Sequence, residues 1–137
     1  MKVYIAARYT RKEEMKEVRD RLESIGIGVT SNWLQEPHSA TTQLTELTDA
    51  TNREYANVDL VDIDRADHML FFSEANLTPR GGRHVEFGYC LGQNKTIHVV
   101  GPKENIFHYL DQVQNHETVD DYIEFQKQSF AEATNLA

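Results

Sequence analysis

The sequence of 137 residues has a single cysteine, Cys90, and no long run of apolar residues. One cysteine cannot form a disulfide within the chain, and without a CxxC motif or a Cys/His grouping it offers no zinc site. The six histidines lack a ligand spacing such as HxxxH, so we expect no metal and no other cofactor. A membrane-spanning helix needs about 20 consecutive apolar residues, so we expect no membrane partner.

Basic residues are in deficit, with 14 Lys and Arg against 22 Asp and Glu and a formal charge of -8. Such a surface repels the backbone of DNA or RNA, so we expect no nucleic-acid polymer as a partner. A local basic cluster is still sufficient for one small phosphate. The length and the ordinary hydrophobic content of 39% fit one globular domain over residues 1–137. Because the chain opens on a strand-like segment rather than a signal peptide, we expect a cytoplasmic protein.

Apolar runs typical of buried strands alternate with segments of helical periodicity. Strands are expected over residues 3–7, 27–33, 66–73 and 95–101. Helices are expected over residues 10–25, 41–65, 84–94 and 119–133, with a short helix or turn at 105–110. This alternation predicts an α/β fold in which helices cover both faces of a parallel sheet of about four to five strands.

Ligands of such sheets bind outside the carboxyl ends of the strands. The unusual polar and glycine-rich segments follow these ends, at residues 7–12, 32–38, 73–82 and 101–108. We therefore predict a binding site at this edge. Candidate contacts are Arg8 and Tyr9 after the first strand, Trp33 after the second, and Asn105 and His108 after the fourth. Trp33 is suited equally to stacking on a planar base and to anchoring the edge of the core.

The loop RGGRH leads directly into a helix and is a candidate anion site. Gly81 and Gly82 allow close approach of the backbone to a ligand, and the first N–H groups of a helix favour an anion. Arg80 and Arg83 add positive charge. The alternative is an ordinary glycine-rich turn with solvated arginines, and the pattern alone leaves both interpretations open.

Two carboxylates are candidates for catalysis. Glu86 lies near the start of the helix that follows RGGRH, where it either serves chemistry or simply favours the helix dipole. Asp59 belongs to an acidic stretch with Asp62 and Asp64, which reads as an acid pair, a metal site or a solvated helix face. For Asp62 and Asp64 we prefer the solvated face.

Three segments of the chain together resemble the nucleoside 2-deoxyribosyltransferase family, which includes deoxynucleoside 5′-monophosphate N-glycosidases. They are MKVYIAARYT, DLVDIDRADHMLFF and GGRHVEFGYCLGQNKTIHVVG. The resemblance implies a flavodoxin-like α/β sandwich, a homo-oligomer, and a small-molecule nucleotide or nucleoside as substrate. It also implies that Glu86 is the nucleophile that attacks C1′ of the sugar, that Asp59 contacts the base, and that Tyr9 is the aromatic residue after the first strand.

The chemistry agrees with these roles. A carboxylate stabilises or traps the oxocarbenium-like transition state of N-glycosidic cleavage, and a second carboxyl group with a raised pKa protonates the departing base. Where nucleoside-type members of the family carry an aspartate, six places before the glutamate, this chain has Arg80. A cation at that position, with Arg83 close by, predicts a substrate with a 5′-phosphate. Arg8 stands where the family frequently has a proline, which indicates either another cation near the pocket or a changed sugar preference.

The sequence therefore predicts an enzyme that cleaves or transfers the N-glycosidic bond of a (deoxy)nucleoside 5′-monophosphate. Three alternatives remain open at this stage. The domain binds or senses a nucleotide without turnover, or it is a deoxyribosyltransferase for unphosphorylated nucleosides. As a third alternative it acts on a dinucleotide such as NAD, with Trp33 or Tyr9 stacking on a ring.

Overall fold

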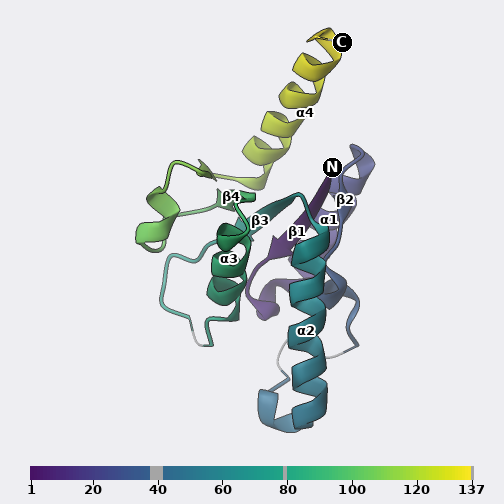
Figure 1. Ribbon diagram of the computed structural model, residues 1–137, viewed down its shortest axis with the longest axis vertical. Helices are drawn as coiled ribbons and strands as arrows, with labels where there is room; N and C mark the ends of the chain where they lie inside the picture. The colour runs from purple at the N-terminus through teal and green to yellow at the C-terminus, as the bar shows by residue number, and fades with distance from the viewer. Residues whose placement is uncertain (38–41, 79, 137) are drawn as a thin grey trace.

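The computed structural model describes residues 1–37, 42–78 and 80–136, which form a parallel sheet between two layers of helices (Figure 1). In chain order the described elements are β1 (Lys2–Ala6), η1 (Tyr9–Arg11), α1 (Lys12–Ser24), β2 (Gly28–Val29), η2 (Asn32–Gln35), η3 (Leu44–Glu46), α2 (Asp49–Arg65), β3 (His68–Phe72), α3 (Gly82–Gly92), β4 (Thr96–Val100), η4 (Ile106–Tyr109), β5 (Val113–His116) and α4 (Val119–Leu136). Among these helices, none is long and apolar enough to cross a membrane.

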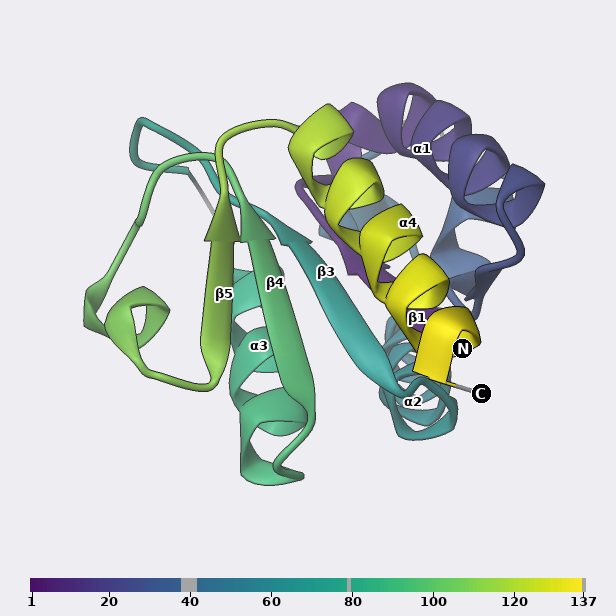
Figure 2. The ribbon, with the colours of Figure 1, turned by 90° about the horizontal axis from the view of Figure 1, so that it is seen from above.

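The sheet has the strand order β2-β1-β3-β4-β5, and every neighbouring pair is parallel. Helices α1 and α4 cover one face, and α2 and α3 cover the other (Figure 2). This arrangement confirms the expected flavodoxin-like α/β fold. The strand order reverses between β1 and β3, and such a switch point is where open α/β sheets bind their ligands.

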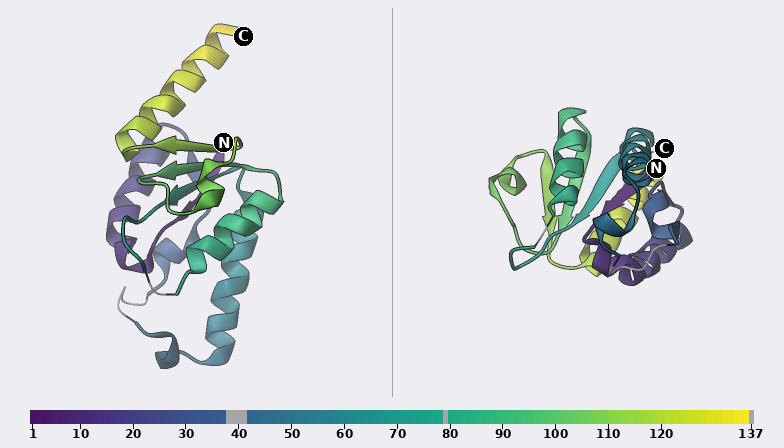
Figure 3. Two further views of the ribbon diagram at one scale, coloured as in Figure 1. Left: turned by 90° about the vertical axis from the view of Figure 1, so that its left-hand side faces the viewer. Right: turned by 90° about the horizontal axis from the view of Figure 1, so that it is seen from below.

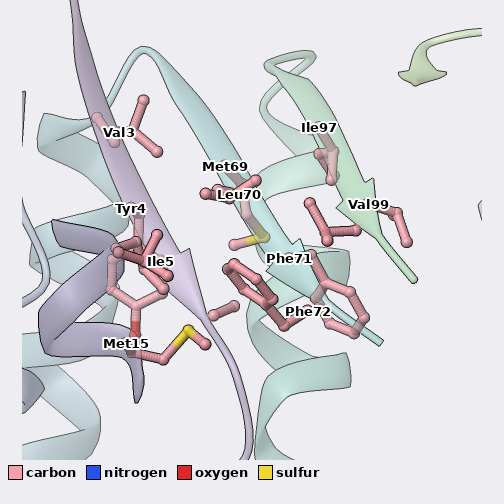
Figure 4. Close-up of a cluster of buried hydrophobic side chains, with 14 of the residues drawn as sticks. Val3, Tyr4, Ile5, Met15, Met69, Leu70, Phe71, Phe72, Ile97 and Val99 are labelled. Atoms are coloured by element: carbon pink, nitrogen blue, oxygen red, sulfur yellow. The ribbon is translucent and has the colours of Figure 1, made fainter. Parts of the chain in front are cut away.

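The core is built by strands that are buried on both faces (Figure 4). On one face, Phe71 of β3 packs its ring edge-on against Phe87 of α3, with centroids 5.3 Å apart. On the other face, the ring of His98 lies 5.1 Å from that of Tyr122 in α4. Helix α4 then continues past the sheet, where its C-terminal part projects from the body of the molecule (Figure 3).

Strand β2 is much shorter than the predicted strand 27–33. Beyond β2, side chains rather than strand backbone form the hydrogen bonds with β1. Ile5 N donates to Ser31 Oγ at 2.7 Å, and Trp33 Nε1 donates to Ile5 O at 2.8 Å. The chain then turns into η2. The predicted helix 41–65 begins only at Asp49, where the Thr48 side chain accepts from Thr51 N at 3.1 Å. Residue 41 lies outside the described residues.

Candidate active site

The carboxylate of Glu86 lies against the switch point between β1 and β3. The Tyr4 hydroxyl, from the middle of β1, donates a hydrogen bond to Glu86 Oε2. Tyr4 is only 1% exposed. Burial raises the pKa of Tyr4 well above its ordinary value, and the neighbouring Glu86 raises it further. The hydroxyl therefore keeps its proton and remains a hydrogen-bond donor to the carboxylate.

Helix α2 brings Asp59 near the same carboxylate, where each acid affects the pKa of the other. Burial raises the pKa of Asp59 to about 8, and repulsion from Glu86 adds to the shift. Burial also raises the pKa of Glu86, to about 7, against the opposing effect of hydrogen bonds from Tyr4 and Asp59. Burial therefore favours protonated forms of this pair near neutral pH, and the two apparent pKa values belong to the pair rather than to either residue. Asp59 Oδ1 is buried and has no hydrogen-bond partner among the described residues.

A second group of polar side chains surrounds this pair. Glu36, at the end of η2, adds negative potential at both Asp59 and Glu86. Burial raises the pKa of Glu36 itself. Lys12 is 3% exposed, and its ammonium donates to the backbone oxygen of Glu36 and, at 3.3 Å, to the Tyr9 hydroxyl. Tyr9 lies near Glu36 and Asp59, because its own pKa is raised first by burial and then by Glu36, Tyr55 and Asp59.

Trp33 occupies a core position rather than a pocket wall. Its side chain is 5% exposed, and its indole N–H is used by the carbonyl of Ile5. The Tyr9 ring packs against it with centroids 5.8 Å apart. The sequence left two roles open for Trp33, and the geometry favours the anchor of the core edge. In this position its ring packs against that of Tyr9.

The RGGRH loop makes a sharp entry into α3. Gly81 is its N-cap residue with φ of 81°, a left-handed conformation for which glycine is suited. Arg80 also has a positive φ, of 77°, and its exposed guanidinium donates to Gln43 Oε1 at 3.0 Å. The first N–H groups of α3, beginning at Gly82, have no acceptor within the helix. This part of the loop has the features of an anion site.

Arg83 is directed inward. Its side chain is buried, and it binds both carboxylate oxygens of Glu104 at 2.6 Å each and Thr78 Oγ1 at 3.1 Å. His84 Nε2 lies 3.1 Å from the same carboxylate. Arg83 therefore holds the start of α3 to the segment that follows β4. The structure does not bring it out beside Arg80.

The remaining predicted contacts lie around this ion pair. Arg8 is half-buried and lies 3.7 Å from Glu74. Asn105 Oδ1 accepts from Phe107 N at 3.0 Å and lines a cavity of about 340 Å³ that Glu74, His84 and Glu104 also line.

His108 lies in the core. It is fully buried, and its Nδ1 accepts from Glu104 N at 3.0 Å. Its ring packs on Phe71 and Phe87, with centroids 5.2 and 5.0 Å away. It is therefore separated from the carboxylate pair.

Sequence reasoning missed Tyr4 and misplaced Asp62. In the sequence, Tyr4 is one residue of an apolar strand. Its partner, Glu86, is seen only once α3 packs against β1. Asp62 is 1% exposed rather than solvated, and it accepts from Asn32 N at 2.8 Å and Asn32 Nδ2 at 2.9 Å. Asp62 thereby joins η2 to α2. Its three-residue spacing from Asp59 in the sequence does not indicate that Asn32 is its partner.

The strand order and helix layers define the class of flavodoxin-like α/β proteins. Solved structures that share this fold include the CMP N-glycosidase BcmB of Clostridium botulinum and a 2-deoxyribosyltransferase of Bacillus psychrosaccharolyticus. For the first, the TM-score is 0.58 at 18% identity, over 93% of this chain and 99% of the other. For the second, it is 0.65 at 21% identity, over 89% and 90%.

No family model matches this sequence, and no curated protein matches it. At the identities of the two solved structures, the likeness establishes the fold and leaves function to the site. Glycoside cleavage and deoxyribosyl transfer are also the two activities that the sequence resemblance implied.

Proposed function

We propose that this protein cleaves the N-glycosidic bond of a (deoxy)nucleoside 5′-monophosphate, or transfers its sugar, through Glu86. One observation carries the proposal: Asp59 lies near Glu86, whose carboxylate accepts from Tyr4, and burial has raised the pKa values of both acids. Two adjacent carboxyl groups that hold one proton supply an acid and a nucleophile at the same pH. The site lies at the switch point where this fold binds ligands.

The first step forms a bond between a Glu86 oxygen and C1′ as the C1′–N bond breaks. The electron pair of that bond goes to the base, and Asp59 supplies the proton that the departing nitrogen needs. Tyr4 acts as a positioning residue, because its hydrogen bond fixes the orientation of the Glu86 carboxylate. The product of this step is a glycosyl ester of Glu86 and a free base.

The second step releases the sugar from Glu86. A water molecule, or the nitrogen of a second base, attacks C1′ while Asp59, now ionised, accepts its proton. The ester bond breaks, and Glu86 returns to its carboxylate form. Water as the acceptor gives hydrolysis, and a base gives transfer, so the same residues support both reactions.

The 5′-phosphate is proposed to lie at the start of α3. Arg80 is exposed there, and Gly81 and Gly82 let the backbone approach a ligand closely. Because Arg83 already neutralises Glu104, Arg80 is the arginine of this loop that we assign to the phosphate. Arg80 donates to Gln43 in this structure, and a phosphate oxygen would replace Gln43 as the acceptor when the substrate binds.

A deoxyribosyltransferase for unphosphorylated nucleosides is the second candidate. It is favoured by the pairing of cations with Glu74 and Glu104, which lowers the positive charge near the loop. The similar fold of a 2-deoxyribosyltransferase is compatible with it.

A panel of nucleoside 5′-monophosphates and the matching nucleosides tests both candidates, with release of free base as the measurement. We expect base release from a monophosphate, loss of that activity in Glu86→Ala, and a raised KM for monophosphates alone in Arg80→Ala. Release only from nucleosides would support the second candidate. Nucleotide binding without any release would support a sensing domain, and full activity of Glu86→Ala would refute the mechanism.

A further inference from the structure

Asp62 is a buried carboxylate of α2 that the proposed mechanism does not use. Its side chain is 1% exposed, and an acidic residue is almost never so fully buried unless it is paired. Asn32 of η2 supplies two partners, because its backbone N donates to Asp62 Oδ2 at 2.8 Å and its Nδ2 donates to Oδ1 at 2.9 Å. Arg65, one turn further along α2, lies 3.4 Å from Oδ1. Both oxygens of Asp62 therefore have hydrogen-bond partners.

This carboxylate joins the two segments that carry the acidic neighbours of Glu86. Helix α2 carries Asp59, three positions before Asp62, and Glu36 directly follows η2. A second contact ties the chain ahead of η2 to the same residue, since Thr30 Oγ1 donates to Asp62 O at 2.8 Å. Asp62 therefore fixes the position of Glu36 relative to Asp59.

Asp62 also acts on the two acids of the site through its charge. Residues three positions apart on a helix are neighbours, with about 5–6 Å between their Cβ atoms, so Asp62 lies close to Asp59. Burial is the largest cause of the raised pKa of Asp59, and the charges of its neighbours, Asp62 among them, add to it. For Glu86 burial is again the first cause, and Asp62 raises its pKa as well. Because Asp62 is buried, salt screens this repulsion only weakly.

The other titratable and charged groups around the two acids come from several elements. Besides Asp62 they are Tyr4 of β1, Tyr9 of η1, Lys12 of α1, Glu36 after η2, and Tyr55 and Arg65 of α2. Glu36 is half-buried, whereas Asp62 is buried and held at both oxygens. Asp62 is therefore the negative charge of this group whose position the fold fixes most firmly.

We propose that Asp62 is a positioning residue of the active site, which fixes η2 against α2 and, by its buried negative charge, keeps on Asp59 the proton that the departing base needs. The inference rests on the proposed function, in which Asp59 is the acid. Asp62 acts through Asp59 and does not itself contact the substrate. Loss of its charge should therefore change the pH at which the pair of Asp59 and Glu86 titrates.

Asp62→Asn tests this role, because the substitution removes the charge and keeps one oxygen that accepts from Asn32. We expect both limbs of the pH dependence of kcat/KM for base release to move to lower pH by about 0.5 pH units or more, with KM little changed. A purely structural defect would instead lower the rate at every pH and leave the limbs in place.

Two further variants of α2 serve as comparisons. Arg65→Gln removes the cation beside Asp62 and leaves its charge less compensated, so both limbs should move to higher pH, by a smaller amount than in Asp62→Asn. Asp64→Asn, at an exposed position of the same helix, is the matched control and should leave both limbs in place.

A direct titration decides the proposal without turnover. ¹³C NMR of the side-chain carboxyl carbons follows the pair, whose signals are identified by their loss in Asp59→Asn and Glu86→Gln. Both apparent midpoints should fall in Asp62→Asn and rise in Arg65→Gln. A wild type that releases no base would refute the proposed function, and the titration would still decide the role of Asp62.

Unmoved midpoints in folded Asp62→Asn would overturn the proposal. If that variant does not fold, unmoved midpoints in Arg65→Gln would overturn it. A shift in Asp64→Asn as large as that in Asp62→Asn would do so as well, because the effect would then not depend on the buried position of Asp62.

Discussion

Within the proposed site, the behaviour of Glu86 depends on two groups that come from different elements and on its burial. Tyr4 of β1 donates to it, Asp59 of α2 lies near it, and burial raises its pKa. Each of these groups has a separate effect on how the rate depends on pH, so each can be tested by one substitution.

We predict a bell-shaped dependence of kcat/KM on pH. Glu86 must be ionised, so the rate rises as pH increases through about 7, and Asp59 must be protonated, so the rate falls through about 8. Asp59→Asn cannot lose a proton and should remove the alkaline limb, with a lower rate throughout. Base release from about pH 5 to about 10 measures this. An unchanged alkaline limb in Asp59→Asn would assign the acid to another residue.

Tyr4→Phe should move the acidic limb to higher pH. The hydrogen bond from Tyr4 lowers the pKa of Glu86, so its removal leaves Glu86 protonated over a wider range. Below neutral pH we expect kcat to fall by roughly tenfold or more, with KM little changed. Tyr122→Phe is the matched control, since Tyr122 is equally buried but contacts Gln126 at 3.3 Å on the other face of the sheet. An acidic limb that stays in place would contradict the positioning role.

Between elements, Arg83 and Arg80 differ in their surroundings, although only Gly81 and Gly82 separate them in the sequence. Arg83 joins α3 to the segment after β4 through Glu104, whereas Arg80 is exposed. Arg83→Met leaves a largely buried carboxylate without its partner, and we expect it to lower the free energy of unfolding by about 3 kcal/mol.

Arg80→Met should change the free energy of unfolding by no more than about 0.5 kcal/mol relative to the wild type. Its effect should be confined to the binding of phosphorylated substrates. Urea denaturation of both variants makes the comparison. Equal losses of unfolding free energy in the two variants would contradict a stabilising role for the ion pair between Arg83 and Glu104.

The sequence predicts those elements whose burial is visible as an apolar pattern. Strands β3 and β4 fall within their predicted ranges and β1 begins and ends one residue before its own, because each is apolar through its centre. Strand β5 was not predicted, since only Val113 of Val113–His116 is buried and the remaining residues are polar. The early end of β2 depends on Ser31 and Trp33 bonding to β1, a contact between distant segments that periodicity does not encode.

The same limit applies to the site. Glu86 stands out because a carboxylate among apolar residues is unusual, and Asp59 follows from the resemblance. Arg83 and Arg80 look equivalent in RGGRH, and only the fold decides which of them meets Glu104. Long-range partners of polar residues are therefore the part of this site that sequence reasoning cannot supply.

For the molecule as a whole, a pair of histidines under α4 links stability to pH. His98 Nδ1 lies 2.9 Å from His116 Nε2, and the rings of Tyr122 and Phe125 cover both imidazoles. Burial lowers the pKa of His98 to about 3, with smaller contributions from His116 and His68. Burial lowers the pKa of His116 as well, against the attraction of Asp121.

This depression of the pKa predicts that stability falls on the acid side. Above the ordinary value of 6.5 neither state takes up a proton at these groups, so their full contribution is present. Between about pH 6.5 and about pH 3, His98 binds a proton in the unfolded chain but not in the folded protein. The free energy of unfolding therefore falls by up to about 1.4 kcal/mol for each pH unit in this range. His98→Gln should flatten the curve of unfolding free energy against pH. Parallel curves for the variant and the wild type would contradict this.

The most direct test of the proposed mechanism is the covalent intermediate on Glu86. A 2′-fluorinated nucleoside 5′-monophosphate slows the release of the sugar, so the glycosyl ester should accumulate and be visible in the mass of the intact protein. We predict a mass gain of one fluorinated sugar phosphate, located by peptide mapping at Glu86 and absent from Glu86→Gln. An adduct on another residue, or base release by Glu86→Gln at the wild-type rate, would contradict the mechanism.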